Sequence, residues 1–414
     1  MSSDKNKEAK VAEQAAAVEF DIGDTARWVG VPLAGNNMKE PVHVNDIRRW
    51  AQAMQNPNPL YYDEAYASQS RFGRIVAPQS FVVATSDSGG GAAPAIQGKI
   101  PGTHLLFGGD EWWFHGPRIF AGDRIRQDRM FFDYKLSQTK FAGPTLFSRG
   151  DTTYINDRGE IIAKQRATGI RYRADEALKR KQYEASGDPE WTDAALDELD
   201  EQKASWIRSF RQLGHERRLD AKVGDKFVRR PIGPHSVTSM AIEWSAYLVM
   251  VWGSFRSEGH GFTSTEGADW SGDAGWLPEF ARDPEGAKID PHRGDPVLNG
   301  PARGHLGARH ARLIGMPRGY GFGASMGAWL LDYISNWAGE WGEIVYCKSS
   351  YLAPSFTGDV AFLDGEVIDI SLTNPRGLGQ PVATVKVTMA NQQHKPMASA
   401  KAEVRLPTPT SPAG

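Results

Sequence analysis

The sequence has little of what metal sites and nucleophilic active sites are built from. It contains one cysteine, Cys347, among 414 residues, which excludes an intrachain disulfide framework and a cysteine-rich metal site. It also has no His-Glu-x-x-His zinc motif and no Gly-x-Ser-x-Gly nucleophile elbow. The sequence therefore predicts no metal site, and it favours neither a zinc enzyme nor a serine hydrolase of that type.

An excess of one charge and long apolar runs are also missing. Lys and Arg number 48, Asp and Glu number 50, and the net charge is -2, so no basic surface indicates nucleic-acid binding. No stretch approaches the roughly 20 apolar residues that span a membrane. Residues 1–19 lack the apolar core of a signal peptide. We expect a cytoplasmic protein that binds neither nucleic acid nor a membrane.

One unit occurs twice in the chain. Residues 59–73 (PLYYDEAYASQSRFG) align without a gap with residues 303–317 (RGHLGARHARLIGMP). Upstream of each copy a polar N-cap candidate, Asn45 or one of Thr238 and Ser239, begins a helix that carries a tryptophan. Downstream, each copy has an apolar helix, a Phe-x-Gly-Asp turn and alternating strands. A helix that is apolar nearly all round predicts a sheet wrapped around it.

The duplication predicts two similar halves of the α+β class, joined by a charged, helix-prone linker. The expected segments are a flexible N-terminus (1–19), a first half (20–175), a linker (176–219), a second half (220–407) with an insertion at about 255–299, and a tail (408–414). The insertion immediately precedes the second copy of the repeated unit, so it lies next to any site that this copy forms.

The stretch NPNPLYYDEAYASQSRFGRIVAP, residues 56–78, resembles the substrate loop and helix of the MaoC-like dehydratases. That family includes the R-specific enoyl-CoA hydratases and the dehydratase domain of fatty-acid synthases. The resemblance covers roughly residues 20–175 and 220–407, and it is more specific in the first half. It implies a double hot-dog fold, in which two long central helices are each wrapped by a curved antiparallel sheet.

The family motif is Asp-x-Asn-Pro-x-His, and the resemblance implies that its Asp and His handle the water and the α-carbon proton. In the first half Asn58 and Pro59 keep the central pair, but Asn56 stands in the Asp column and Tyr61 in the His column. An amide does not titrate, and a tyrosine has a pKa of about 10, so neither is a general base near pH 7. We predict that Asn58 and Tyr61 shape a substrate pocket instead.

In the second half, His305 falls in the column of Tyr61. Histidine suits proton transfer near neutral pH, so His305 is the predicted catalytic base or acid; the alternative is a loop histidine in a Gly-rich turn. The Asp column holds a glycine, and the carboxylates that could replace the Asp lie in the insertion: Asp295 first, then Asp290 and Asp273. Arg303 is predicted to contact the substrate, because a cation suits the phosphates of coenzyme A.

A glycine-rich segment, GYGFGAS at residues 319–325, precedes the second apolar helix. Its glycines could let a thioester carbonyl approach the N–H groups that begin the helix, or they could serve close helix–sheet packing. The residues predicted to bind substrate here are Gly319, Gly321 and Gly323, with Tyr320 as a further proton donor. Trp113 is predicted to contact a bulky or ring-bearing acyl group.

The resemblance implies an acyl-CoA hydratase or dehydratase, a lyase that needs no cofactor beyond the coenzyme A of its substrate and that forms a homodimer. Two alternatives remain open. Because both motifs are degraded, the chain could be a non-catalytic protein that binds acyl-CoA or partners a catalytic subunit. A hot-dog thioesterase would need a carboxylate on or near a buried helix, for which Asp332 and Asp87 are the candidates.

Overall fold

The computed structural model describes residues 20–38, 40–86, 93–98, 100, 103–183, 187–247, 305, 308–312 and 314–410. The predicted site residues Asp295 and Arg303 lie outside these ranges. The predicted flexible N-terminus, the insertion at about 255–299 and the thioesterase candidate Asp87 lie outside them as well.

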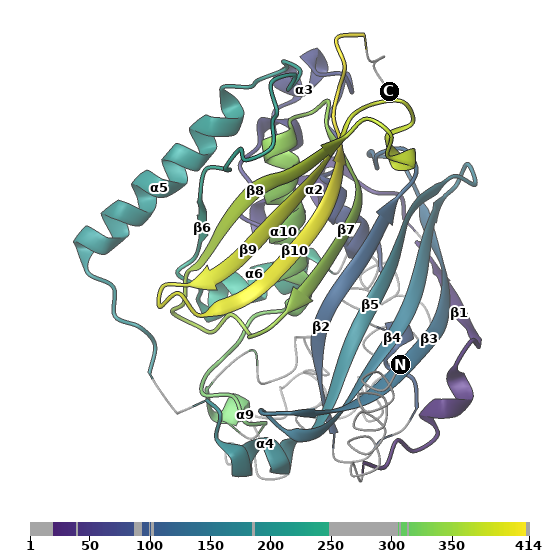
Figure 1. The fold of residues 1–414 in the computed structure, drawn as a ribbon, viewed down its shortest axis with the longest axis vertical. Coiled ribbons are helices and arrows are strands. Elements are labelled where there is room, and N and C mark those ends of the chain that lie inside the picture. The colour runs from purple at the N-terminus through teal and green to yellow at the C-terminus, as the bar shows by residue number, and fades with distance from the viewer. Residues whose placement is uncertain are drawn as a thin grey trace, which may run out of the picture.

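The described strands form a single antiparallel sheet, which is strongly curved (Figure 1). Its ten strands lie in the order β1-β3-β4-β5-β2-β7-β10-β9-β8-β6. The strands are β1 (Pro32–Asn37), β2 (Thr103–Phe114), β3 (Ile125–Thr139), β4 (Gly143–Asn156), β5 (Ile161–Arg173), β6 (Arg230–Ile232), β7 (Glu343–Tyr351), β8 (Ala361–Ser371), β9 (Val382–Asn391) and β10 (Pro396–Arg405). Pairing of β2 with β7 joins the two halves of the chain into this one sheet.

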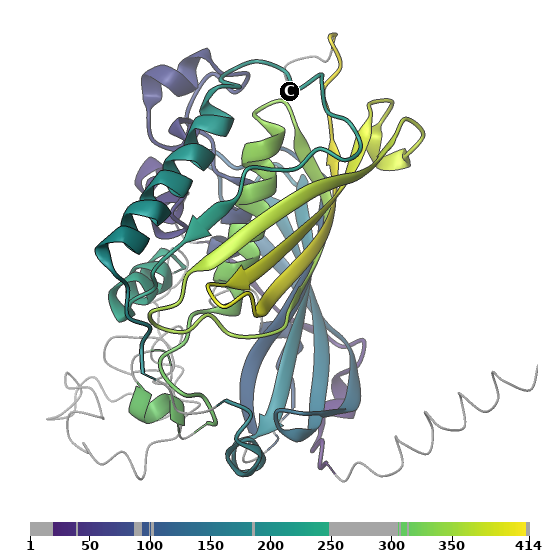
Figure 2. The same cartoon turned by 60° about the vertical axis from the view of Figure 1, so that its left-hand side comes forward.

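The helices gather on one side of the sheet, as Figures 1 and 2 show for α2, α3, α5 and α10. The α-helices are α2 (Val44–Ala53), α3 (Glu64–Gln69), α4 (Ala174–Arg180), α5 (Asp193–Arg211), α6 (Val237–Ala246), α9 (Ala308–Arg312) and α10 (Gly323–Ala338). The shorter 3-10 helices are η1 (Thr25–Trp28), η2 (Pro59–Tyr61), η3 (Gln79–Thr85), η4 (Ala93–Ala95) and η7 (Pro375–Gly377). Within the described part of the chain, no helix is long and apolar enough to cross a membrane.

Helix α10 is the central helix of the second half and is buried along almost its whole length. It packs against β2 and β7 and against η3 of the first half. Two glycines allow this close packing. A Cβ at Gly323 would lie 2.7 Å from the Cβ of Phe107, and one at Gly327 would lie 2.2 Å from the hydroxyl of Tyr351. The apolar, small-residue sequence of α10 thus suits a helix enclosed by strands.

The repeated unit is visible in the backbone. In the first half, Val76 forms an isolated antiparallel bridge with Phe120; in the second half, Tyr320 forms the same bridge with Phe356. Each phenylalanine begins one of the Phe-x-Gly-Asp turns, and the glycine of each turn has a positive φ. The two halves therefore share the connection between the segment before the central helix and the turn before the strands.

The central helix of the first half differs from the predicted long helix. Within the described residues it is η3, a fully buried 3-10 helix from Gln79 to Thr85. Its sequence includes three β-branched residues, which lose side-chain freedom in an α-helix. The hydroxyl of Thr85 also donates to the carbonyl oxygen of Val82 at 2.7 Å, a local bond that competes with α-helical bonding.

Candidate active site

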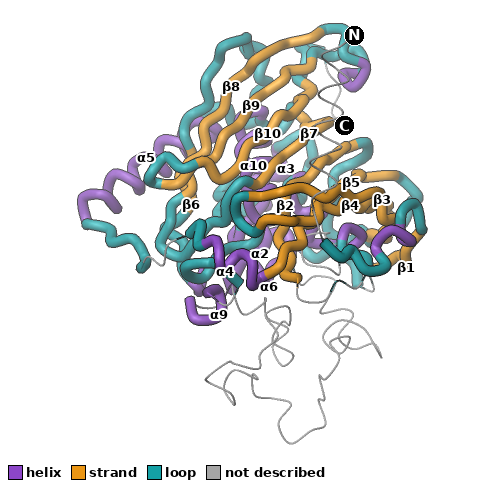
Figure 3. Tube along the Cα trace, turned by 60° about the horizontal axis from the view of Figure 1, so that its bottom comes forward, coloured by secondary structure: helices purple, strands orange, loops and turns teal. Residues whose placement is uncertain are grey.

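A cavity of about 560 Å³ lies between the two halves, beside the N-terminus of α10. The first half contributes the beginning of β2, the β3–β4 hairpin and the end of β5. The second half contributes α6, the segment that leads into α10 and the loop that follows β7. Gln182, just after α4, and Met316, just after α9, also line the cavity. Figures 1 and 3 show α4 and α9 close together.

Four of the predicted site residues line this cavity: His305, Tyr320, Gly321 and Gly323. They come together because the backbone from residue 320 to 323 leads into α10 while His305 lies over it. The rings of His305 and Tyr320 are 4.3 Å apart between centroids, and His305 lies 4.4 Å from the ring of Phe322. The predicted cluster of a histidine, a tyrosine and a glycine-rich helix start is therefore present in the structure.

The hydrogen bonding of His305 determines which of its ring nitrogens is available. Nδ1 lies 2.5 Å from the main-chain oxygen of Tyr320. A carbonyl oxygen only accepts, so Nδ1 carries the proton and the neutral ring leaves a lone pair on Nε2. Burial lowers the pKa of His305 to about 4. The ring is thus neutral at pH 7, and Nε2 can accept a proton.

The N-terminus of α10 presents main-chain donors to the same cavity. Its N-cap residue is Phe322, which makes no side-chain hydrogen bond to the first turn. Gly323 and Ala324, the first two residues of the helix, line the cavity. The first N–H groups of a helix have no partner within the helix, and the helix dipole favours negative charge beside them. This arrangement suits an oxygen that gains negative charge during a reaction.

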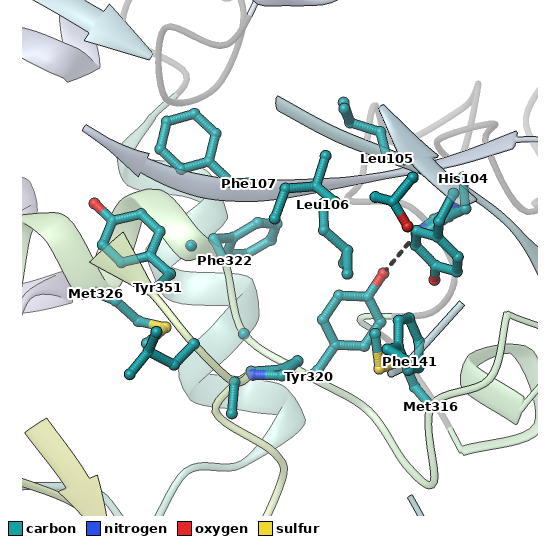
Figure 4. Close-up of a pocket in the computed structure, with 18 of the residues that line it drawn as sticks. His104, Leu105, Leu106, Phe107, Phe141, Met316, Tyr320, Phe322, Met326 and Tyr351 are labelled. Carbon is teal, nitrogen blue, oxygen red and sulfur yellow. Dashed lines mark hydrogen bonds between the residues drawn. The ribbon is translucent and has the colours of Figure 1, made fainter. Parts of the chain in front are cut away.

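The site also contains a residue that the sequence did not indicate. His104 of β2 lines the cavity, and its Nε2 lies 3.0 Å from the hydroxyl oxygen of Tyr320. Both side chains are only 3% exposed, and Figure 4 shows them facing each other at one end of the cavity. No motif surrounds His104 in the sequence. It reaches the site only because β2 of the first half lies beside the central helix of the second.

The wall of the cavity is mostly apolar and aromatic. Of the described residues that line it, Lys140 in the β3–β4 turn carries the one fixed charge, and it is exposed at the surface. The described part of the chain contains no group of three His, Cys, Asp or Glu residues that could hold a metal ion. The chemistry available to the described site is therefore proton transfer and hydrogen bonding around an apolar ligand.

The first-half motif lies elsewhere, against the C-terminal end of α10. The side-chain amide nitrogen of Asn58 donates to Oδ1 of Asn336 at 2.8 Å, and Nδ2 of Asn336 donates to Oδ1 of Asn56 at 3.0 Å. Tyr61 is 3% exposed, and burial raises its pKa to about 12. Neither Asn58 nor Tyr61 lines the cavity. The structure therefore does not bring these two predicted substrate-binding residues to His305.

Gly319 and Trp113 are also separate from the cavity lining. The carbonyl oxygen of Gly319 accepts from the main-chain nitrogen of Thr357 at 2.9 Å, so this residue supports the turn that follows. Trp113 alternates along β2 with the buried Trp112 and packs against Tyr346, with ring centroids 5.7 Å apart. The structure therefore places Trp113 at the junction of the two half-sheets.

Asp332, the carboxylate considered for a thioesterase, is fully buried within α10. Its Oδ1 accepts a hydrogen bond of 2.6 Å from the hydroxyl of Ser80, which itself accepts from the indole of Trp50 at 3.0 Å. Burial raises the pKa of Asp332 to about 6, although the charge of Arg230 opposes the shift. Asp332 does not line the cavity, so this carboxylate has no access to a thioester bound there.

Comparisons with known proteins agree with this architecture. Residues 27–165 match the family model for the FAS1-like dehydratase domain region. Over 233 residues the chain is 27% identical to a probable enoyl-CoA hydratase alpha subunit of Thermomonospora curvata, a match that covers 53% of this chain and 69% of that protein. A UPF0336 protein of Thermobifida fusca is 32% identical over 90 residues, which cover 21% of this chain and 59% of that protein.

Solved structures extend the likeness to most of the chain. A MaoC-like dehydratase superposes with a TM-score of 0.58 at 16% identity, covering 92% of this chain and 100% of that one. A Mycobacterium tuberculosis protein described as having a double hot-dog fold gives a TM-score of 0.50 at 11% identity, covering 91% and 96%. The architecture is that of a double hot-dog protein, as predicted. The chain is thus similar in sequence to a FAS1-like dehydratase region and to an enoyl-CoA hydratase subunit, and similar in fold to a MaoC-like dehydratase, which confirms the resemblance seen in the motif.

Proposed function

We propose that the protein is a lyase that adds water reversibly to a 2-enoyl-CoA thioester. The observation that carries this proposal is the position of His305. His305, whose Nε2 is unprotonated, lines the same apolar cavity as the first residues of α10, a helix without a side-chain N-cap bond. A hydratase needs both features, a base for water and donors for the thioester oxygen. The coenzyme A of the substrate is the only cofactor that this reaction needs.

The proposed reaction begins when Nε2 of His305 accepts a proton from water. The water oxygen bonds to the β-carbon, and the π electrons of the C=C bond move toward the thioester oxygen. The N–H groups at the start of α10, at Gly323 and Ala324, stabilise the negative charge that develops there. A proton then reaches the α-carbon and gives the 3-hydroxyacyl-CoA. Dehydration follows the same steps in reverse.

The size and lining of the cavity support a bulky acyl group. A volume of about 560 Å³ falls within the range of pockets that enclose small molecules. Its lining includes Phe107, Phe141 and Tyr172, whose rings suit a large apolar or ring-bearing chain. The exposed cation Lys140 stands at the rim, where it would meet a phosphate of coenzyme A.

The test is hydratase activity on a panel of 2-enoyl-CoAs, from short chains to ring-bearing acyl groups. Wild type should hydrate at least one bulky member, and His305→Ala should lose about 100-fold or more in kcat, within the usual range for a general base. Tyr61→Phe is the matched control, since Tyr61 occupies the same motif column in the first half but lies outside the cavity. It should retain kcat.

Two outcomes would support other functions. Tight binding of enoyl-CoA or 3-hydroxyacyl-CoA without turnover would support a non-catalytic, acyl-CoA-binding function. The replacement of the motif's Asp by Asn56 and of its His by Tyr61 favours this alternative. Release of free coenzyme A, detected with a thiol reagent, would support the thioesterase function.

The homodimer and the cytoplasmic location remain predictions. Sedimentation of the purified chain measures the first, and cell fractionation measures the second.

A further inference from the structure

Inside the cavity, one hydrogen bond joins a side chain of the first half to a side chain of the second. His104 comes from β2 of the first half and Tyr320 from the segment before α10 of the second. Nε2 of His104 lies 3.0 Å from the hydroxyl oxygen of Tyr320 (Figure 4). The first half, which lacks the motif's acid and histidine, thus places a histidine of its own in the cavity that contains His305.

The fold does not require this polar pair. At the position equivalent to Tyr320 the first half has Val76, which forms the same backbone bridge. His104 lies edge-on to the ring of Tyr172, with centroids 5.6 Å apart, a contact that a phenylalanine would also make. Burying a hydroxyl and an imidazole costs more free energy than burying two phenyl rings, even when the polar groups bond to each other. A role in the reaction therefore explains the His104–Tyr320 pair better than a role in packing does.

We propose that Tyr320 donates the proton to the α-carbon of the substrate and that His104 is the positioning residue that holds its hydroxyl. This inference rests on the proposed hydratase function and assigns the second proton transfer, which His305 alone does not account for. Burial raises the pKa of Tyr320 above its ordinary value, so the hydroxyl carries its proton at every physiological pH.

The step balances without any further reactant. His305 Nε2 takes one proton from water as the oxygen bonds to the β-carbon and an enolate forms. The electron pair of the enolate then takes the hydroxyl proton of Tyr320, which makes the Cα–H bond and restores the carbonyl. His104, with its proton on Nε2, donates a hydrogen bond to the phenolate that remains. The proton held by His305, whose ring adjoins that of Tyr320, returns to the phenolate oxygen.

The test is a double-mutant cycle measured on the best enoyl-CoA of the panel. Tyr320→Phe should lower kcat about 100-fold, with KM changed little, because both rings fill the same space. His104→Phe keeps the packing on Tyr172 and should lower kcat about tenfold. His104→Gln should recover most of that loss, since its amide can place an N–H near the position of Nε2. In the Tyr320→Phe background, His104→Phe should have almost no further effect.

Two controls separate this role from a structural one. The midpoint of thermal unfolding shows whether each variant folds, and the Kd for the 3-hydroxyacyl-CoA product shows whether the cavity is intact. Additive losses in the double mutant, or equal losses for His104→Phe and His104→Gln at unchanged stability, would overturn the pairing. Absence of turnover by wild type would overturn the proposed function, and this inference with it. Turnover by wild type with additive losses would overturn the inference alone.

Discussion

Asn58 donates its side-chain amide to Oδ1 of Asn336 at 2.8 Å, although the two residues are 278 positions apart in the chain. Asn336 in turn donates to Asn56 at 3.0 Å. The remnant of the first-half motif therefore holds its loop against the central helix of the second half. Its asparagines act as structural contacts between the halves, which explains how the layout of an active site persists without the catalytic residue types.

Removing the shared partner should destabilise the protein without affecting catalysis. Asn336→Ala leaves the side-chain donor of Asn58 without its bond, and Oδ1 of Asn56 keeps only a long bond of 3.4 Å from the main-chain nitrogen of Asn58. At about 1–3 kcal/mol for an unsatisfied buried group, the loss should be about 1–3 kcal/mol for Asn58 and up to about 6 kcal/mol if the remaining bond of Asn56 contributes nothing. Urea unfolding measures it. The control is Ser335→Ala on the same helix, because the Ser335 hydroxyl has no hydrogen bond in the described structure. Equal stability of the two variants would contradict the structural role.

The pKa of His305 predicts an unusual pH profile for kcat/KM. A general base works when unprotonated, so activity is lost as pH falls through its pKa in the folded enzyme. That pKa is lowered to about 4, whereas an ordinary histidine titrates near 6.5. We expect kcat/KM to stay level from pH 8 to about 5 and to fall only below that. An acidic limb centred near pH 6.5 would show that the ring is more hydrated than this structure indicates.

Substitutions at Gly323 and Gly321 can separate the effect of close packing on stability from the effect of the helix start on kcat. A methyl group at Gly323 would meet the Cβ of Phe107 at 2.7 Å, whereas one at Gly321 has no neighbour closer than 3.6 Å. Gly323→Ala should therefore cost about 1–3 kcal/mol of stability through overpacking. It should also lower kcat, since the helix start must move away from β2.

Gly321→Ala is the matched variant, because it also lines the cavity but makes only ordinary van der Waals contacts. It should change the midpoint of chemical denaturation little. If both variants lose kcat equally at equal stability, the glycines matter through access of the thioester to the backbone, and close packing at Gly323 is then of minor importance.

Lys140, at the rim of the cavity, should affect the KM for the substrate and leave kcat unchanged. Lys140→Glu reverses the charge that would face a phosphate of coenzyme A, and an effect of about 1 kcal/mol in a hydrated site corresponds to roughly a fivefold rise in KM. Because salt screens such a contact, the difference should shrink at high ionic strength, with kcat unchanged. Lys135→Glu makes the same charge change on an exposed residue of β3 outside the cavity, so its KM should match that of wild type.

Several elements could be read from the sequence because local pattern determines them. The segment of residues 321–337 is apolar nearly all round, and it contains most of the buried helix α10. The predicted N-caps were wrong by two or three residues, since His43 and not Asn45 caps α2, and Ser236 rather than Thr238 or Ser239 caps α6. The hydroxyl of Ser236 accepts from the main-chain nitrogen of Ser239 at 3.0 Å. Neighbouring serines compete for the cap position, and the sequence does not decide between them.

The sequence predicted only some of the residues of the candidate site. His305 and Tyr320 could be found because the repeat aligns one with Tyr61 and the glycine-rich segment contains the other. His104 could not be found, because its contact with Tyr320 depends on the pairing of β2 with β7 across the two halves. The partners of Asn56 and Asn58 were hidden for the same reason. Contacts between residues hundreds of positions apart have no periodicity in the sequence.

The buried carboxyl of Asp332 makes a prediction about stability and pH. Its folded pKa of about 6 lies above the ordinary value of 3.8, so between these values the native state binds more protons than the unfolded state. Stability therefore falls as pH rises from about 4 to 6, and the full penalty of roughly 3 kcal/mol remains above that range. Asp332→Asn keeps an oxygen to accept from Ser80, and it should raise the free energy of unfolding at pH 7.5 by up to this amount.

The gain should vanish near pH 4, where the native carboxyl is already protonated. Urea unfolding of wild type and Asp332→Asn at several pH values measures the difference directly. Asp364→Asn provides the control, because the Asp364 side chain is 48% exposed beside Arg229 and an exposed ion pair of this kind contributes about 1 kcal/mol or less. The prediction is contradicted if Asp332→Asn and wild type have the same free energy of unfolding at pH 7.5 and the same dependence of it on pH. Ionisation of Asp332 would then not destabilise the fold, and its hydrogen bond from Ser80 would be one of several that stabilise the charge.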